Sequence, residues 1–264
     1  MIVIDPGHSG RYLRSIHAPT GLRDIDYPNY PEIYEMFDVS FCLGKALRLD
    51  GYRVRLTKEH ALDSVGHAAR AKIANDAKAD VAVSVHDDHG QSPAFEATYD
   101  QRGHADGNGR YHQMYRGTGR SRTVFDQPSV ARQSQAYAKI IAQARTGSQN
   151  ERVTVQENSF TGRDPLEPGN LALVQLLARV PWVYNEMGAK TAGNPRTAMS
   201  ISSEQRYAEG LLVGIERARP LATHTVAQPS AGASMLRSCL VQRVEPRPGH
   251  YTRPKIYLPD QFNR

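Results

Sequence analysis

Three short apolar runs, each followed within a few residues by an ionisable side chain, constrain the fold of this chain most strongly. The runs are residues 2–4, 81–85 and 181–185, and they lead to His8, His86 and Glu186. Nearly continuous apolar runs of this length predict strands buried on both faces, as in parallel sheets that helices cover. Because the carboxyl ends of parallel strands share one edge of a sheet, we expect the three side chains to gather there.

The segments around these runs show helix and strand patterns in turn. Helical spacing of apolar residues predicts helices over residues 31–50, 64–77, 126–144, 170–178 and 202–218, and short apolar stretches predict strands over 52–57, 95–99 and 153–156. Residues 9–30 and 102–122 show neither period and are predicted to be long loops. The order predicts an α/β fold with a twisted, largely parallel central sheet of about five or six strands, flanked by helices on both faces.

The composition changes after Pro220, where the chain becomes rich in Pro, Ser, Ala and Thr and then basic. We therefore expect one globular domain over residues 1–219, followed by a tail over residues 220–264 that is draped over the domain or flexible. A core of ordinary size suits a chain of this length.

The charge balance is basic, with 33 Lys and Arg against 27 Asp and Glu and a net charge of +6. This favours a polyanionic neighbourhood such as nucleic acid or an anionic cell wall. No folded nucleic-acid-binding motif is visible, so we expect no nucleic-acid partner. No run approaches the length of a membrane-spanning helix, and Met1 leads directly into the first strand, so neither a membrane span nor a signal peptide is expected.

Cys42 and Cys239 are the only two cysteines. They cannot form a Cys-rich zinc site, and they form no dense disulfide framework. Cys42 falls in an amphipathic helical pattern and is predicted to be a small core residue. A zinc site in this chain would therefore need His and carboxylate ligands.

Such ligands are available at the predicted strand ends. A single histidine there is more often structural, but His8 and His86 repeat the same pattern and together favour zinc. Imidazole and carboxylate groups are the usual ligands of catalytic zinc, and a further glutamate can carry protons during hydrolysis. Glu186 is the candidate for that second role. An unpaired carboxylate directly after an apolar strand would be costly to bury, so its presence there indicates either a function or a partner. The alternative for Glu186 is a salt bridge to an arginine.

The sequence resembles a known family, the zinc-dependent N-acetylmuramoyl-L-alanine amidases of the type 3 class. The resemblance covers residues 1 to about 218. It rests on IVIDPGHSG at residues 2–10, GYRVRLT at 51–57, the Arg-x-x-x-Ala-Asn of residues 70–75, Ser84-Val85-His86, and residues 181–188 with Glu186.

The resemblance implies a role for each site residue. His8 and His86 would be zinc ligands, and Glu186 the catalytic acid and base. In the family the third ligand is a glutamate that opens the first helix about nineteen residues before the second strand. Glu32 lies 19 residues before Gly51 and Glu35 lies 16 before it, so we choose Glu32 as the third ligand. Glu35 is expected to lie near the site without binding the metal.

Other polar residues have secondary roles in this interpretation. Asp5 and Asn75 are expected to orient neighbours, Asp5 through a hydrogen bond to a ligand histidine. Asp24 or Asp26 could line the cleft, and His89 is interpreted as a solvent or substrate contact. The Arg- and Tyr-rich stretch 102–122 is either a contact for an anionic wall or a solvated loop.

The implied function is hydrolysis of the amide bond between N-acetylmuramic acid and L-alanine in peptidoglycan, with Zn²⁺ as cofactor. Two alternatives remain: a zinc peptidase that cuts within the stem peptide, and a catalytically inactive wall-binding protein. We expect a monomer that acts outside the cytoplasm, as a phage lysin or as a bacterial autolysin whose leader has been removed.

Overall fold

The computed structural model describes residues 1–17, 22–87, 94–96, 115–116, 123–124, 128–156, 174, 177–187, 199–221 and 230–242. Its centre is a sheet of six strands in the order β4-β1-β5-β10-β6-β9. The strands are β1 (Ile2–Pro6), β4 (Val54–Leu56), β5 (Val81–Asp87), β6 (Ala94–Glu96), β9 (Val155–Gln156) and β10 (Trp182–Met187). Strands β4, β1, β5 and β10 are parallel, and β6 pairs with β10 in the antiparallel direction. The predicted α/β fold with a largely parallel sheet is confirmed.

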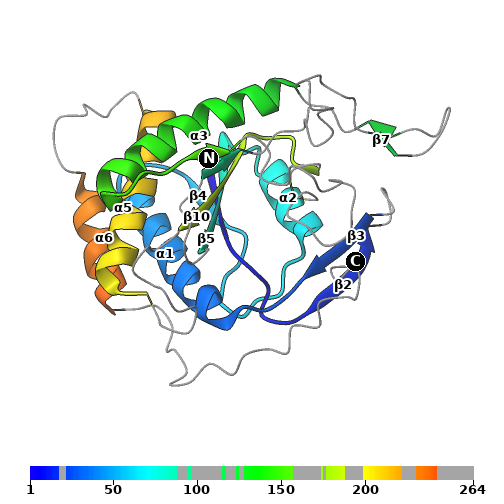
Figure 1. Ribbon diagram of the computed structural model, residues 1–264, viewed down its shortest axis with the longest axis horizontal. Coiled ribbons are helices and arrows are strands. Elements are labelled where there is room, and N and C mark those ends of the chain that lie inside the picture. The colour runs from blue at the N-terminus through cyan, green and yellow to red at the C-terminus, as the bar shows by residue number, and fades with distance from the viewer. Residues whose placement is uncertain are drawn as a thin grey trace.

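Helices cover both faces of this sheet (Figure 1). They are α1 (Tyr30–Leu49), α2 (His67–Asp76), α3 (Pro128–Gln149), α5 (Ile201–Ala218) and α6 (Ala231–Gln242). Side chains alternate along each strand, so Ile2 and Ile4 face α1, α3 and α5, whereas Val3 faces α2. All of these strand residues are almost completely buried. None of the helices in the described ranges is long and apolar enough to cross a membrane.

Two stretches that were predicted to be loops contain hairpins. Strand β2 (Leu13–His17) pairs in the antiparallel direction with β3 (Leu22–Asp26), inside the stretch 9–30. Strand β7 (Tyr115–Arg116) pairs with β8 (Thr123–Val124), which overlaps the stretch 102–122. The loop prediction is wrong at these points. Strand β2 is mostly exposed, so it lacks the apolar alternation by which a half-buried strand is recognised.

Helix α6 lies in the segment that the sequence analysis described as a tail, where it had predicted no helix. It packs on α1 and buries Leu236 and Leu240 in the main core. At its start, the backbone amide of Gly232 donates a hydrogen bond to Asp50, at the end of α1. Helix α6 is therefore part of the packed domain.

A disulfide bond fastens α6 to α1. Cys42 and Cys239 are joined, with their Cα atoms 5.6 Å apart and a sequence separation of 197. Cys42 is buried in the core as predicted, but it is disulfide-bonded to Cys239, a pairing that the sequence alone does not predict. Pairing across such a separation depends on how α6 docks, which no local pattern reveals.

Candidate metal centre

The register of the parallel strands places the predicted site residues at one edge of the sheet. Pro6 of β1 lies beside Val85 of β5, so the turn with His8 and the end of β5 with His86 are neighbours. Glu186 of β10 is the register partner of His86. The three strand ends thus meet, as the sequence predicted, because all three strands run in the same direction.

His8, Glu32 and His86 form a compact cluster. One ligand atom from each residue lies within 4.8 Å of the other two. Glu32 lies between the histidines: its Oε2 is 2.8 Å from His8 Nε2, and its Oε1 is 3.0 Å from His86 Nδ1. The side chains are between 4% and 12% exposed, so the cluster is nearly buried.

Local structure directs the carboxylate of Glu32 toward the histidines. Glu32 lies in the first turn of α1, where the positive end of the helix dipole favours a negative charge. The side-chain amide of Asn29 donates to Oε2 at 2.7 Å, and the backbone amide of Asp87 donates to Oε1 at 3.0 Å. The carboxylate is therefore fixed in orientation from two sides.

The cluster is strongly polarised. Burial alone would raise the pKa of Glu32, but the charges and hydrogen bonds of His8 and His86 outweigh it and hold this pKa well below its ordinary value. Burial also opposes a charge on His8, yet Glu32 and Asp26 raise its pKa well above the usual range. The Glu32 carboxylate thus favours positive charge beside it, which a bound cation would also supply.

Glu35 faces elsewhere. Its Oε1 accepts a hydrogen bond of 2.9 Å from the backbone amide of Met199, just before α5. Of the two glutamates that the sequence analysis compared, Glu32 is the one that the structure brings to the histidines. Glu35 instead ties α1 to the segment that leads into α5.

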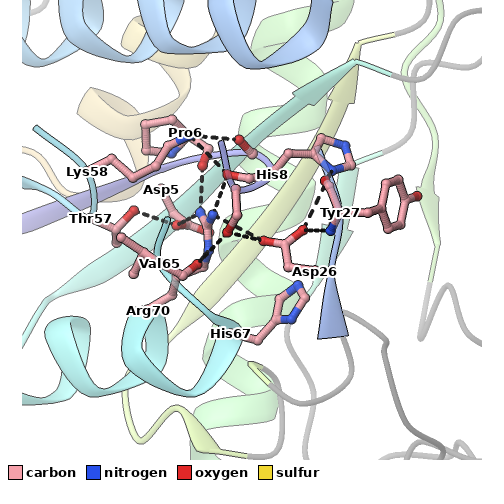
Figure 2. Close-up of polar contacts among 12 residues, drawn as sticks. Asp5, Pro6, His8, Asp26, Tyr27, Thr57, Lys58, Val65, His67 and Arg70 are labelled. Carbon is pink, nitrogen blue, oxygen red and sulfur yellow. Dashed lines mark hydrogen bonds and ion pairs between the residues drawn. The ribbon is translucent and has the colours of Figure 1, made fainter. Parts of the chain in front are cut away.

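Two buried cations hold the backbone around His8 (Figure 2). His8 has a positive φ of 55°, a conformation that costs energy for a residue with a side chain. The ammonium group of Lys58 donates to the carbonyl oxygens of Gly7, His8 and Ala61 at 3.1, 2.9 and 3.1 Å. Arg70 donates to the carbonyl oxygens of Pro6 and His8, both at 2.6 Å.

Carboxylates balance these cations. Asp5 accepts hydrogen bonds from Arg70 at 2.7 Å, Thr57 at 2.6 Å and Ser84 at 2.9 Å. Asp5 was expected to accept a hydrogen bond from a ligand histidine. In the described part of the chain it has no hydrogen bond with His8 or His86. Asp26 lies closer to that role, since its Oδ1 is 3.7 Å from His8 Nδ1.

The remaining predicted residues have structural contacts. Asp24 accepts hydrogen bonds from the backbone amides of His67 and Ala68 and so caps the start of α2. Asn75 donates to the carbonyl oxygen of Leu177 and accepts from the backbone amide of Arg179, which orients the chain before β10 as expected. His89 and most of the stretch 102–122 lie outside the described residues.

Sequence reasoning missed Lys58, Arg145 and Tyr207. Lys58 is 1% exposed, and Arg145 and Tyr207 are fully buried. Lys and Arg side chains are almost never fully buried unless they are paired, so the sequence alone does not predict that Lys58 and Arg145 are buried. For Lys58, the only available signal is that it directly follows a predicted strand.

The fold of this chain is similar to that of solved structures of other proteins. Ami1 from Mycobacterium smegmatis, an N-acetylmuramyl-L-alanine amidase, matches with a TM-score of 0.51 and 16% identity over 82% of this chain and 95% of that one. The apo form of Ami1 from Mycobacterium abscessus matches with a TM-score of 0.51 and 15% identity over 82% and 97%. No curated protein sequence matches the chain. The family model described as N-acetylmuramoyl-L-alanine amidase matches residues 2–217, most of the chain, and the protein therefore belongs to that family.

Proposed function

We propose that this chain is a zinc-dependent amidase of peptidoglycan. It would hydrolyse the amide bond between the lactyl group of N-acetylmuramic acid and the L-alanine of the stem peptide. The observation that carries the proposal is the convergence of His8, Glu32 and His86, whose ligand atoms lie within 4.8 Å of one another. The family match supports the reaction.

The donor set fits zinc. Two imidazole nitrogens and one carboxylate oxygen are typical of catalytic zinc sites, which keep a fourth position open for water. Calcium and magnesium prefer oxygen ligands alone. The backbone carbonyl of Tyr27 lies 3.1 Å from His8 Nδ1 and can accept a hydrogen bond from the Nδ1–H, which leaves Nε2, beside Glu32, as the nitrogen that would hold a metal. His8, Glu32 and His86 would hold the metal, with the histidines neutral and the carboxylate ionised.

Glu186 is assigned the proton transfers. When bound, zinc supplies a Lewis acid that polarises the scissile carbonyl and lowers the pKa of a water molecule. The carboxylate of Glu186 accepts a proton from the attacking water and delivers it to the alanine nitrogen as the C–N bond breaks. Its side chain is partly exposed and shares the register position of His86, so it can reach substrate at the same edge.

The test compares Glu186→Gln with wild type on purified peptidoglycan. Glutamine cannot take up the proton, so we expect a loss of activity of at least about 100-fold with one zinc per chain retained. Glu209→Gln is the matched control, because Glu209 lies on α5 in a partly exposed ion pair with Arg237. Full activity of Glu186→Gln would contradict the assigned role.

Product masses distinguish the amidase from its alternatives. Free N-terminal L-alanine together with intact lactyl groups on the glycan indicates the proposed reaction. Cleavage between stem-peptide residues would indicate a peptidase, and binding to peptidoglycan without any product would indicate an inactive wall-binding protein. A zinc determination on the same sample tests the cofactor.

We further propose that the protein acts outside the cytoplasm as a monomer, with its catalytic domain in residues 1–219. The disulfide between Cys42 and Cys239 supports this location, because disulfides form and persist in oxidising compartments and are rare in the cytosol. Within the C-terminal stretch 220–264, α6 packs on this domain. Sedimentation of the oxidised chain tests the oligomeric state.

A further inference from the structure

Behind the metal centre, on the opposite side of the strands from α2, Arg145 of α3 contacts the end of β10. Its guanidinium donates to the backbone carbonyl of Glu186 at 2.7 Å and to the side-chain oxygen of Asn185 at 3.2 Å. A third hydrogen bond, of 2.9 Å, goes to Gln149 one turn further along α3. Arg145 is fully buried, and its hydrogen bond to Asn185 is buried with it.

Tyr207 of α5 completes the arrangement. Its hydroxyl lies 3.2 Å from the carbonyl oxygen of His86 and 3.1 Å from that of Asn185, so its proton is shared between the ends of β5 and β10. The guanidinium carbon of Arg145 lies 4.6 Å from the centre of the Tyr207 ring. The two side chains therefore act as one unit on both strand ends.

Packing alone does not account for this pair. Removing a guanidinium from water costs several kcal/mol, and an apolar side chain of similar volume would fill the α3–α5 interface at lower cost. The helices approach closely here: a Cβ on Gly210 would lie 2.7 Å from the Cα of Arg145. What an apolar side chain could not supply is the set of hydrogen bonds to the backbone next to His86 and Glu186.

We propose that Arg145 and Tyr207 are positioning residues that fix Glu186 relative to His86 for amide hydrolysis. Neither residue touches the substrate in this account; each acts through the backbone of a site residue. The inference rests on the proposed function, in which His86 binds the metal and Glu186 transfers protons. A displacement of about 1 Å at a reacting group can cost about 100-fold in rate, so loss of such a support is expected to be measurable.

The test uses Tyr207→Phe, which keeps the ring and removes only the hydroxyl. Its matched control is Tyr137→Phe. Tyr137 of α3 is also buried in the main core, but its hydroxyl accepts from Gln133 and Arg219 at the opposite, amino-terminal end of the strands. Both variants lose one buried hydroxyl, and only one of them loses hydrogen bonds to the site.

For Tyr207→Phe we expect kcat to fall by about 10-fold, with KM within about twofold of wild type and one zinc per chain retained. Tyr137→Phe should lower Tm by a similar amount and leave kcat within about twofold of wild type. Arg145→Met should lower kcat further, and Arg145→Lys should restore part of it, because lysine keeps a donor at this position. If Arg145→Met does not fold, Tyr207→Phe alone decides.

The inference is overturned if Tyr207→Phe keeps the wild-type kcat, or if both tyrosine variants lose the same fraction of kcat. A loss of activity that comes only from a higher KM or a lower zinc content would also contradict the inference. The hydrogen bonds of Tyr207 would then serve substrate binding or metal binding instead. A wild-type chain that releases no lactyl-bearing glycan or free alanine terminus refutes the proposed function instead. The two failures are thus distinguishable in one experiment.

Discussion

The ammonium nitrogen of Lys58, a side chain that is almost completely buried, lies 2.9 Å from the backbone carbonyl oxygen of His8. Burial, assisted by the charge of Arg70, lowers the pKa of Lys58 to about 7. The left-handed backbone of His8 is thus stabilised by a cation that is itself costly to keep charged. This relationship ties the geometry of a proposed ligand to one buried side chain.

Replacing Lys58 by Met is expected to weaken zinc binding. The side-chain volume is similar, but the carbonyl oxygens of Gly7 and His8 lose a donor, and the turn that presents the imidazole is loosened. Loss of such a supporting group costs about 10- to 100-fold in metal affinity. Titration against a competing chelator measures it. Lys72→Met, which removes an exposed pair with Asp76, serves as the control and should leave the affinity unchanged.

A methyl group at Gly7 should disturb the proposed metal site through His86 rather than through His8. A Cβ on Gly7 would lie 2.6 Å from Nδ1 of His86, closer than side-chain contacts allow. For Gly7→Ala we expect zinc affinity to fall at least about 10-fold. Gly147→Ala is the comparison: its Cβ meets nothing within 4 Å, and alanine should stabilise α3 by about 0.5–1 kcal/mol. Equal zinc affinity in both variants would disprove the steric argument.

Reduction of the disulfide should lower stability without removing activity. The bond joins two residues at a sequence separation of 197, and loss of such a bond typically costs about 2–5 kcal/mol. Urea unfolding with and without reductant measures the difference, and the Cys42→Ala, Cys239→Ala double variant should show no response to reductant. We expect kcat at 25 °C to be retained, because Cys42 lies about 15 Å along α1 from Glu32. A large loss of kcat would mean that α6 supports the site directly.

The parts of the fold that could be predicted from the sequence are those with a recognisable local pattern of residues. The apolar runs of β1, β5 and β10 identify buried strands, and His8, His86 and Glu186 then follow from the common direction of parallel strands. The family resemblance implies a glutamate about nineteen residues before Gly51, and it was this resemblance that favoured Glu32 over Glu35 on the same helix. Glu32 is the one that lies beside the two histidines.

What the sequence did not reveal depends on contacts between distant segments. The bond from Cys42 to Cys239 requires α6 to dock on α1, and the role of Arg145 requires α3 to lie over the end of β10. The exposed strand β2 carries no apolar alternation, so its pairing with β3 left no signal. Buried Arg and Lys side chains are recognisable only once their partners are known.

The covalent link between α1 and α6 also determines what a protease can do to the chain. Any single cut between residues 43 and 238 leaves two pieces that stay joined through Cys42 and Cys239. His8 and Glu32 are then in the piece before the cut, and Glu186 is in the same piece or in the other, but all remain in one molecule. A nicked chain would run as a single band on a non-reducing gel and separate only after its sulfurs are reduced.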